Sequence, residues 1–186
     1  MIAVGITTFI LMEAVSWYSV LEISVIAVLI VYPMLWYLEK KDFYSAFFVE
    51  KSPGEAKMSL VLLFVMLGVM TTIGWGLFEQ KYTVLCGLLM WGFGDAAAAL
   101  IGIPFGKHKI AKKSLEGSAA MFLAAFVLCL IGMKTHSNYA IDKIWEMSFL
   151  SALISCLSEL YTPSKYDTFT VPLSALLSLL LLERIL

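Results

Sequence analysis

The sequence predicts an all-α, polytopic membrane protein with about seven transmembrane helices. Its 186 residues are 61% hydrophobic and only 15% charged, with a mean hydropathy of +0.89, whereas soluble domains are about half apolar and about a quarter charged. The apolar residues gather in segments of nearly 20 residues, the length that a helix needs to cross the hydrocarbon core of a bilayer. No tract between these segments has the composition of a soluble domain, so we expect residues 1–186 to form a single integral membrane domain.

The candidate spans follow one another along the chain as seven apolar segments, at residues 2–17, 20–38, 58–78, 83–101, 117–133, 145–161 and 170–186. The first is the weakest candidate, because only Ser-Trp-Tyr-Ser separates it from the second, and without it six spans remain. It has no basic region at its start and contains Glu13, so we expect a span and not a cleaved signal peptide. Trp17 and Trp36 lie at segment ends, where interfacial aromatic residues are common.

Positive charges in the connections predict the orientation. Nine lysines lie in the connections after the second, fourth and sixth segments, whereas the opposite side has four basic residues. By the positive-inside rule, the side with nine lysines faces the cytoplasm. We therefore expect a multi-pass protein in which the connections after segments 83–101 and 145–161 share the cytoplasmic face, whether or not the first segment spans.

Charge and cysteine usage exclude several classes of function. The net charge is −1 and there is no long basic run, so the sequence gives no indication of nucleic-acid binding. Cys86, Cys129 and Cys156 lie far apart in apolar segments, without a CxxC or Cys/His spacing. The sequence therefore predicts neither a zinc site nor a disulfide framework.

Asp95 lies inside the fourth apolar segment. A charged side chain at the centre of a transmembrane helix costs roughly 2.5–3.5 kcal/mol on insertion scales, so an intramembrane aspartate is by default a candidate functional residue. It precedes Gly102 by seven residues, or about 10 Å of helix, which places it within reach of a polar cavity that opens at the cytoplasmic face. The alanines at 96–99 would allow close helix packing, but packing does not account for the charge.

A glycine- and lysine-rich connection follows this helix. Gly102 and Gly106 allow the backbone to turn sharply and to approach a ligand closely, and the lysines after them are Lys107, Lys109, Lys112 and Lys113. This composition is typical of a phosphate-binding loop. Two alternatives stay open, because glycine and proline also mark ordinary loops and lysines near a membrane bind anionic lipid headgroups.

Ser114, Glu116 and Gly117 begin the next apolar segment. A helix N-terminus carries free N–H groups and a partial positive charge, so it can bind phosphate together with the preceding lysines. Two structural interpretations fit the pattern equally well: Ser114 as an ordinary N-cap, and Glu116 as a first-turn carboxylate that complements the helix dipole.

A second polar group of residues ends the sixth segment, with Glu159 followed by Asp167. Asp167 is expected on the same face as the lysine-rich connection. Magnesium takes one or two carboxylates together with phosphate oxygens and waters, so Asp95, Glu159 and Asp167 are candidate ligands, with Glu116 as a further acidic candidate. Alternatively, Asp167 forms an Asx-turn ahead of Pro172 and Glu159 extends to the membrane interface.

Two sequence patterns resemble those of the CTP-dependent lipid alcohol kinases. The first is Gly94-Asp95-x-x-Ala98-x-x-x-Gly102-x-x-x-Gly106, followed by Lys113-Ser114-x-Glu116-Gly117-Ser118; the second is Glu159 followed by Asp167-Thr168-x-Thr170-Val171-Pro172. This family includes dolichol kinase, phytol kinase and the CTP-dependent diacylglycerol kinase, and it is related to phosphatidate cytidylyltransferases. The resemblance covers about residues 50–180. Thr168 departs from the asparagine usual there, and no basic Arg-Lys…His element precedes Lys40.

The resemblance implies transfer of the γ-phosphoryl group of CTP to the hydroxyl of a membrane lipid alcohol, such as a polyprenol, a phytol-like alcohol or diacylglycerol. It implies a site on the cytoplasmic face with Asp95, Glu116 and Asp167 as catalytic residues. Mg²⁺ would be held by Asp95, Asp167 and Glu159. The residues implied to bind the nucleotide are Gly102, Gly106, Lys107, Lys112, Lys113, Ser114 and Gly117.

Two alternatives remain at this stage. Within the same superfamily, the same ligands could serve cytidylyl transfer from CTP to phosphatidate. In a different class, the chain could be a small transporter or scaffold, since intramembrane carboxylates also mark ion pathways. Transporters commonly contain paired repeats with broken helices, and this sequence has no such repeat. The acceptor lipid and the oligomeric state are not encoded in any motif.

Overall fold

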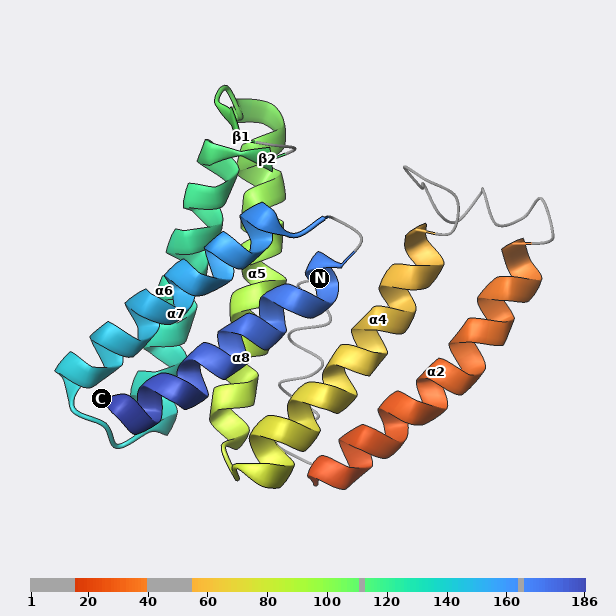
Figure 1. Cartoon of the computed structure of the whole chain (residues 1–186), viewed down its shortest axis with the longest axis horizontal. Coiled ribbons are helices and arrows are strands. Elements are labelled where there is room, and N and C mark those ends of the chain that lie inside the picture. The colour runs from red at the N-terminus through yellow and green to blue at the C-terminus, as the bar shows by residue number, and fades with distance from the viewer. Residues whose placement is uncertain (1–15, 40–54, 111–112, 164–165) are drawn as a thin grey trace.

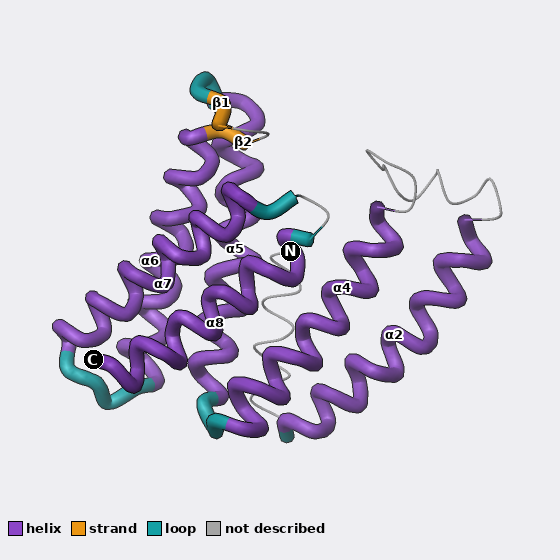
Figure 2. The backbone as a smooth tube through the Cα atoms, viewed as in Figure 1, coloured by secondary structure: helices purple, strands orange, loops and turns teal. Residues whose placement is uncertain are grey.

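The computed structural model describes residues 16–39, 55–110, 113–163 and 166–186. These residues form long helices joined by short loops, with one small hairpin at one end (Figures 1 and 2). In chain order the elements are α2 (Trp17–Glu39), α4 (Glu55–Met70), the π-helical turn η1 (Thr71–Leu77), α5 (Lys81–Phe105), β1 (Lys109–Ile110), β2 (Lys113–Ser114), α6 (Leu115–His136), α7 (Ile141–Tyr161) and α8 (Asp167–Ile185). The strands pair antiparallel, with Lys109 opposite Ser114.

The prediction of an all-α, multi-pass membrane fold is confirmed. Five segments of the described chain are long and apolar enough to cross a membrane: Trp17–Leu38, Lys57–Leu77, Lys81–Phe105, Leu115–His136 and Asp167–Ile185. The sixth long helix, α7, falls at the expected segment 145–161 but is less apolar, because Asp142, Lys143 and Glu146 lie in its first two turns. Most of the first predicted span, residues 2–15, lies outside the described residues.

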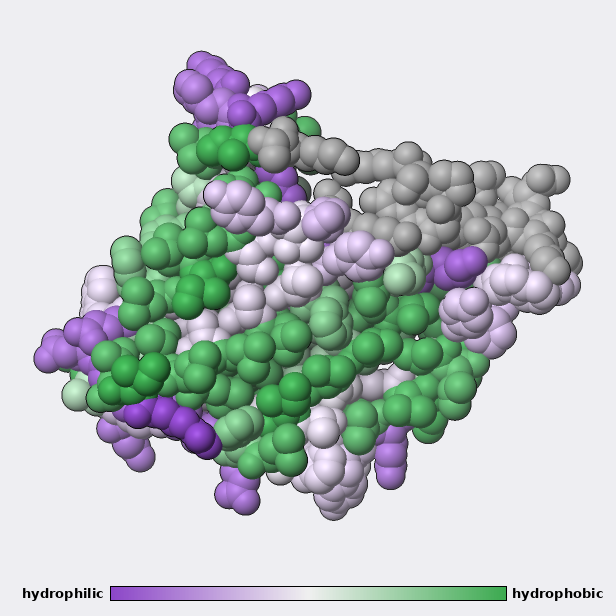
Figure 3. Space-filling view, in the orientation of Figure 1, coloured by the Kyte–Doolittle hydropathy of each residue, from purple (hydrophilic) through white to green (hydrophobic). Residues whose placement is uncertain are grey.

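The helices form a layered bundle in which α5 is central. It packs against α6 and α8, α7 packs between α6 and α8, and α4 joins α8 to the outermost helix, α2 (Figure 1). One buried cluster, which includes Met66, Met70 and Trp91, lies between α4, α5 and α8. A second, which includes Met90 and Met147, lies between α5, α6, α7 and α8. The face shown in Figure 3 is largely hydrophobic over the helices and hydrophilic at the hairpin, as expected for helices that contact lipid.

Glycines bring α5 and α6 into close contact beneath the hairpin. A Cβ atom on Gly117 would lie 2.9 Å from the carbonyl oxygen of Ala98 and 3.1 Å from Cα of Gly102. A Cβ atom on Gly102 would lie 2.8 Å from Oγ of Ser114. Small residues at such crossings allow transmembrane helices to pack closely. Gly102, expected in a phosphate-binding loop, and Gly117, expected at a phosphate-binding helix N-terminus, therefore have a packing role.

The opposite end of the bundle is joined by Glu183. Its Oε1 accepts hydrogen bonds from Nε2 of Gln80, at 2.7 Å, and from the hydroxyl of Tyr139, and its carbonyl oxygen accepts from Nζ of Lys143 at 3.1 Å. Burial, together with the hydrogen bond to this carboxylate, raises the pKa of Tyr139 to about 12. These contacts connect the start of α5, the loop before α7 and the end of α8.

The Gly117–Gly102 contact can be tested by adding one methyl group. We expect Gly117→Ala to lower the stability by about 1–3 kcal/mol, because the added methyl overpacks a junction lined by backbone atoms. Gly68→Ala is the matched control: its Cβ would meet a flexible methyl of Leu21 at 3.3 Å, and alanine is the better helix former. Thermal unfolding in detergent checks both variants, and an unchanged midpoint for Gly117→Ala would contradict the close contact.

Candidate functional site

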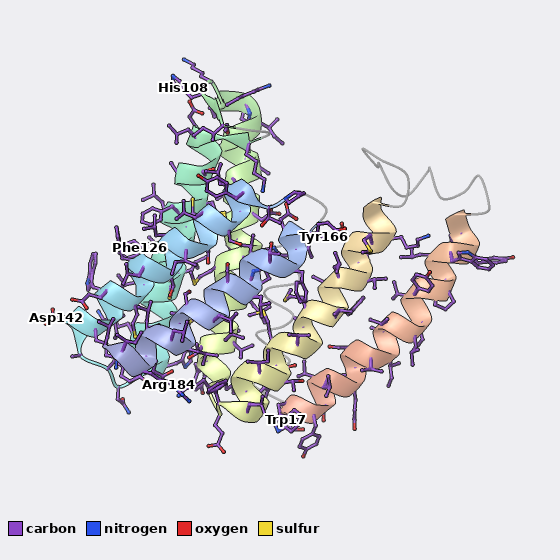
Figure 4. All side chains as sticks on the ribbon, in the orientation of Figure 1. Trp17, His108, Phe126, Asp142, Tyr166 and Arg184 are labelled. Carbon is purple, nitrogen blue, oxygen red and sulfur yellow. The ribbon has the colours of Figure 1, made fainter. Side chains whose placement is uncertain are left out.

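A cavity of about 300 Å³ lies below the hairpin, at the end of the bundle where α5 ends and α6 begins. Its polar and charged lining comes from six elements. These residues are Asp95 on α5, Lys109 on β1, Lys113 and Ser114 on β2, Ser118 on α6, Glu159 on α7 and Asp167 on α8. In Figure 4 the labelled His108 and Tyr166 lie toward this end of the molecule, and Asp142 and Arg184 lie toward the opposite end.

The fold brings together most of the residues singled out from the sequence. Asp95, Glu159 and Asp167, the three expected metal ligands, line one cavity together with Gly102, Gly106, Lys113, Ser114 and Gly117. They converge because the C-terminal ends of α5 and α7 meet the N-terminal ends of α6 and α8 at the same end of the bundle (Figure 1). Lys112 lies outside the described residues.

Lys113 is the central contact of the cavity. Its Nζ donates to the carbonyl oxygen of Glu159 at 2.6 Å and to Oε1 of the same residue, and it lies 3.6 Å from Oδ2 of Asp167. The side chains of Lys113, Glu159 and Asp167 are only 17%, 7% and 20% exposed. An ammonium group so placed offsets the cost of holding two carboxylates away from water.

The hairpin is what positions Lys113, and its attachment to α6 uses two residues expected at the site. Ser114 caps α6, with its Oγ accepting from the N–H of Gly117 at 3.1 Å. Glu116 accepts from the N–H of His108 at 3.2 Å, and its Oε1 lies 2.8 Å from Nδ1 of the same histidine. Glu116 is not among the residues that line the cavity. The capping interpretation of Ser114 thus describes its observed contact.

The helix N-terminus offers fewer free donors than the sequence suggested. The N–H of Leu115 donates to the carbonyl oxygen of His108 at 2.8 Å, and the N–H of Gly117 donates to Ser114. Two of the first three N–H groups of α6 are therefore occupied. Positive charge at the cavity comes instead from side chains, those of Lys113 and the exposed Lys109. Lys107 is exposed and is not among the lining residues.

Counted over the described residues, the lining of the cavity carries more negative than positive charge. Asp95, Glu159 and Asp167 face Lys109 and Lys113 in its lining, which leaves one net negative charge. Asp95 and Glu159 are both close enough to Asp167 for their charges to repel it. Among the described residues, no group of three or more His, Cys, Asp or Glu side chains is arranged to hold a metal ion by itself.

Two atoms in the lining have unused hydrogen-bonding capacity. Oγ of Ser118 and Oε2 of Glu159 are buried and have no hydrogen-bond partner within the part of the chain that the structure describes. The patterns described from the sequence contain Lys109 and Ser118, but neither was assigned a role in the site, and the structure places both in the lining. Ser118 follows the capping Ser114 by four residues, so both lie on one side of α6, and this spacing could have identified it.

Comparison with known proteins finds distant relatives of this chain, two of which are named as lipid kinases. A dolichol kinase of Schizosaccharomyces pombe is 32% identical over 92 residues, which are 48% of this chain and 18% of that protein. A phytol kinase of Synechocystis is 27% identical over 121 residues, 62% of this chain and 51% of that protein. An uncharacterised protein of Rickettsia prowazekii is 32% identical over 123 residues, 62% of this chain and 54% of that protein. No family model and no solved structure matches the chain.

The resemblance predicted from the sequence motifs is therefore confirmed: a dolichol kinase and a phytol kinase are distant homologues of this chain. The chain spans about half of the length of the phytol kinase and the Rickettsia protein, and less than a fifth of the dolichol kinase.

The contact between Lys113 and Glu159 can be measured with a double-mutant cycle. We expect Lys113→Met to destabilise the protein by about 3 kcal/mol, because it leaves two carboxylates in the cavity without their cation. Combining it with Glu159→Gln is expected to recover part of that loss, since the two residues are directly coupled. Lys109→Ala, at an exposed lysine, is the control, with a change within about 0.5 kcal/mol. If the changes in the free energy of unfolding of the two single variants simply add in the double variant, that result would contradict the contact.

Proposed function

We propose that this chain transfers the γ-phosphoryl group of CTP to the hydroxyl of a membrane lipid alcohol, at a cavity that faces the cytoplasm. The observation that carries the proposal is the convergence of Asp95, Glu159 and Asp167 from three helices around Lys113, in one cavity at an end of a membrane bundle. Relatives named dolichol kinase and phytol kinase support the same class of reaction. Phosphoryl transfer depends mainly on positioning and on neutralising charge, which this arrangement is suited to provide.

The charge of the cavity supports a requirement for a divalent cation. A nucleoside triphosphate is strongly anionic, and the lining already carries one net negative charge. Two carboxylates are a donor set that suits Mg²⁺, because this ion takes one or two protein carboxylates and completes its shell with phosphate oxygens and waters. Asp95 and Asp167 would hold it. When bound, Mg²⁺ would neutralise phosphate charge and orient the triphosphate.

The lysines and glycines that line the cavity would help to bind the triphosphate of CTP. Lys113 and Lys109 would contact phosphate oxygens, since both line the cavity on its hairpin side. Gly102 and Gly106 would let the end of α5 pack closely against Ser114, which keeps the hairpin lysines beside the nucleotide. The acceptor would approach from the lipid side, where Ala98, Ala99 and Ile103 provide the apolar part of the lining.

The first experiment uses the purified protein in detergent with Mg²⁺, a mixed lipid extract and CTP labelled on its γ-phosphate. We expect label to enter the organic phase, and substitution of ATP for CTP to reduce the transfer. Chelation of Mg²⁺ should abolish it. Label that enters lipid only from α-labelled CTP would overturn the proposal in favour of cytidylyl transfer to phosphatidate. Absence of transfer from either position would favour a transporter or scaffold.

The role of Asp95 is tested by Asp95→Asn. We expect the rate of phosphoryl transfer to fall about 100-fold or more, because the variant loses a charge that would help to hold Mg²⁺ against the triphosphate. Glu146→Gln is the matched control: it removes a carboxylate from an exposed position near the opposite end of α7, and it should retain the activity of the unmodified chain. Normal transfer by a well-expressed Asp95→Asn variant would exclude this role.

A further inference from the structure

We propose that Ser118 and Glu159 together receive the hydroxyl group of the acceptor lipid, with Ser118 as donor and Glu159 as proton acceptor. The inference rests on the proposed function and adds to it the place where the alcohol binds. It also gives Glu159 a task other than the metal ligation expected from the sequence. Its basis is a pair of unused hydrogen-bonding atoms in the lining of one cavity.

Ser118 is held so that its hydroxyl is available in the cavity. The residue is only 6% exposed and lines the cavity. Its carbonyl oxygen accepts a hydrogen bond from Sγ of Cys156 at 3.2 Å, which fixes α6 against α7 at this level. Its Oγ has no partner among the described residues. A buried hydroxyl left without a partner costs about 1–3 kcal/mol, so a ligand that supplies the missing bond would be favoured here.

Glu159 presents one oxygen to Lys113 and leaves the other unused. The residue is 5% exposed, and the contacts of Lys113 to its Oε1 and carbonyl oxygen fix the position of the carboxylate. Oε2 has no donor among the described residues. Since a carboxylate oxygen only accepts hydrogen bonds when ionised, the ligand group that fits Oε2 is a donor.

The need for a hydrogen-bond donor at Oε2 of Glu159 favours an alcohol over a phosphate. A hydroxyl both donates and accepts, so it can donate to Oε2 of Glu159 while its oxygen accepts from Oγ of Ser118. An ionised phosphate oxygen only accepts, and it would be repelled by Glu159. Ser118 also lies farther from the hairpin than Ser114, because it is four residues, or about 6 Å, farther along α6.

The reaction then proceeds with a simple balance of atoms and charge. The acceptor oxygen forms a bond to the γ-phosphorus of CTP as the bond from that phosphorus to the β–γ bridging oxygen breaks. The proton of the acceptor hydroxyl passes to Oε2 of Glu159. The products are the lipid phosphate ester and CDP, and the proton on Glu159 is afterwards lost to water. Lys113 acts as a positioning residue for Glu159.

The chain offers matched controls for Ser118. Ser148, Ser151 and Ser155 on α7 are fully buried, and their hydroxyls have no partner in the described part of the chain. None of the three is among the residues that line the cavity. They share the burial and the unpaired hydroxyl of Ser118 and differ in location, so an effect specific to Ser118 would reflect the cavity.

The test measures KM for the acceptor and for CTP separately, with phytol and dioleoylglycerol as acceptor probes. For Ser118→Ala we expect the KM of the better acceptor to rise about fivefold to tenfold, as for the loss of one hydrogen bond, with the KM for CTP unchanged. Ser151→Ala should change neither value. An unchanged acceptor KM in Ser118→Ala, or an equal rise in both constants, would overturn the inference while leaving the proposed function intact.

Glu159→Gln tests the proton acceptor. We expect kcat to fall at least 100-fold, while the KM for CTP stays unchanged. Retained binding of CTP with Mg²⁺ would show that the variant is folded. A kcat equal to that of the unmodified chain would overturn the role of Glu159.

A binding measurement distinguishes failure of the inference from failure of the proposed function. In the unmodified chain we expect phytol to raise the unfolding temperature more than phytane, the hydrocarbon without the hydroxyl, and Ser118→Ala to remove that difference. If the unmodified chain transfers no phosphoryl group to any lipid, the proposed function fails. Equal stabilisation by phytol and phytane would overturn the hydroxyl site in either case.

Discussion

The contact of Lys113 with Glu159 and Asp167 is the interaction on which the site depends. Carboxylates at the end of a membrane bundle are costly unless a positive charge is close to them. Lys113 supplies that charge from the hairpin, so one side chain joins β2 to the ends of α7 and α8. The pairing of Glu116 with His108 serves the same purpose indirectly, because it attaches the hairpin to α6. The charge balance of the cavity therefore depends on the conformation of the hairpin.

The spans and the convergence of the site could be predicted from the sequence for identifiable reasons. Apolar length fixes where helices cross a membrane, and alternation of their direction then places the connections after α5 and α7 at the same end. Asp95 can be recognised in the sequence because it interrupts an apolar helix. Asp167 can be recognised because the topology places the start of α8 at the same end of the bundle, and both residues line the cavity. Predicting this required no knowledge of side-chain packing.

The remaining features of the site depend on helix rotation and on partners that no motif specifies. Glu116 belongs to a pattern that resembles a kinase motif, yet it contacts His108 outside the cavity lining. Gly102 was expected in a phosphate-binding loop and Gly117 at a phosphate-binding helix N-terminus, but both lie at a helix crossing where an added Cβ would meet backbone atoms. Ser118 stands in the same pattern without an assigned role, and its place in the lining follows from its position four residues after Ser114 on α6.

The depth of Asp95, about 10 Å of helix below Gly102, has a consequence for how a product would leave. An uncharged alcohol can sink from the headgroup layer to this level at little cost, because it carries no charge into the bilayer. A phosphate monoester at the same level carries charge in a region where charge costs several kcal/mol. For the proposed reaction, phosphorylation would therefore shift the preferred depth of the lipid in the bilayer toward the headgroup layer. The lower free energy of the charged product in that layer would drive its release without any movement of the helices.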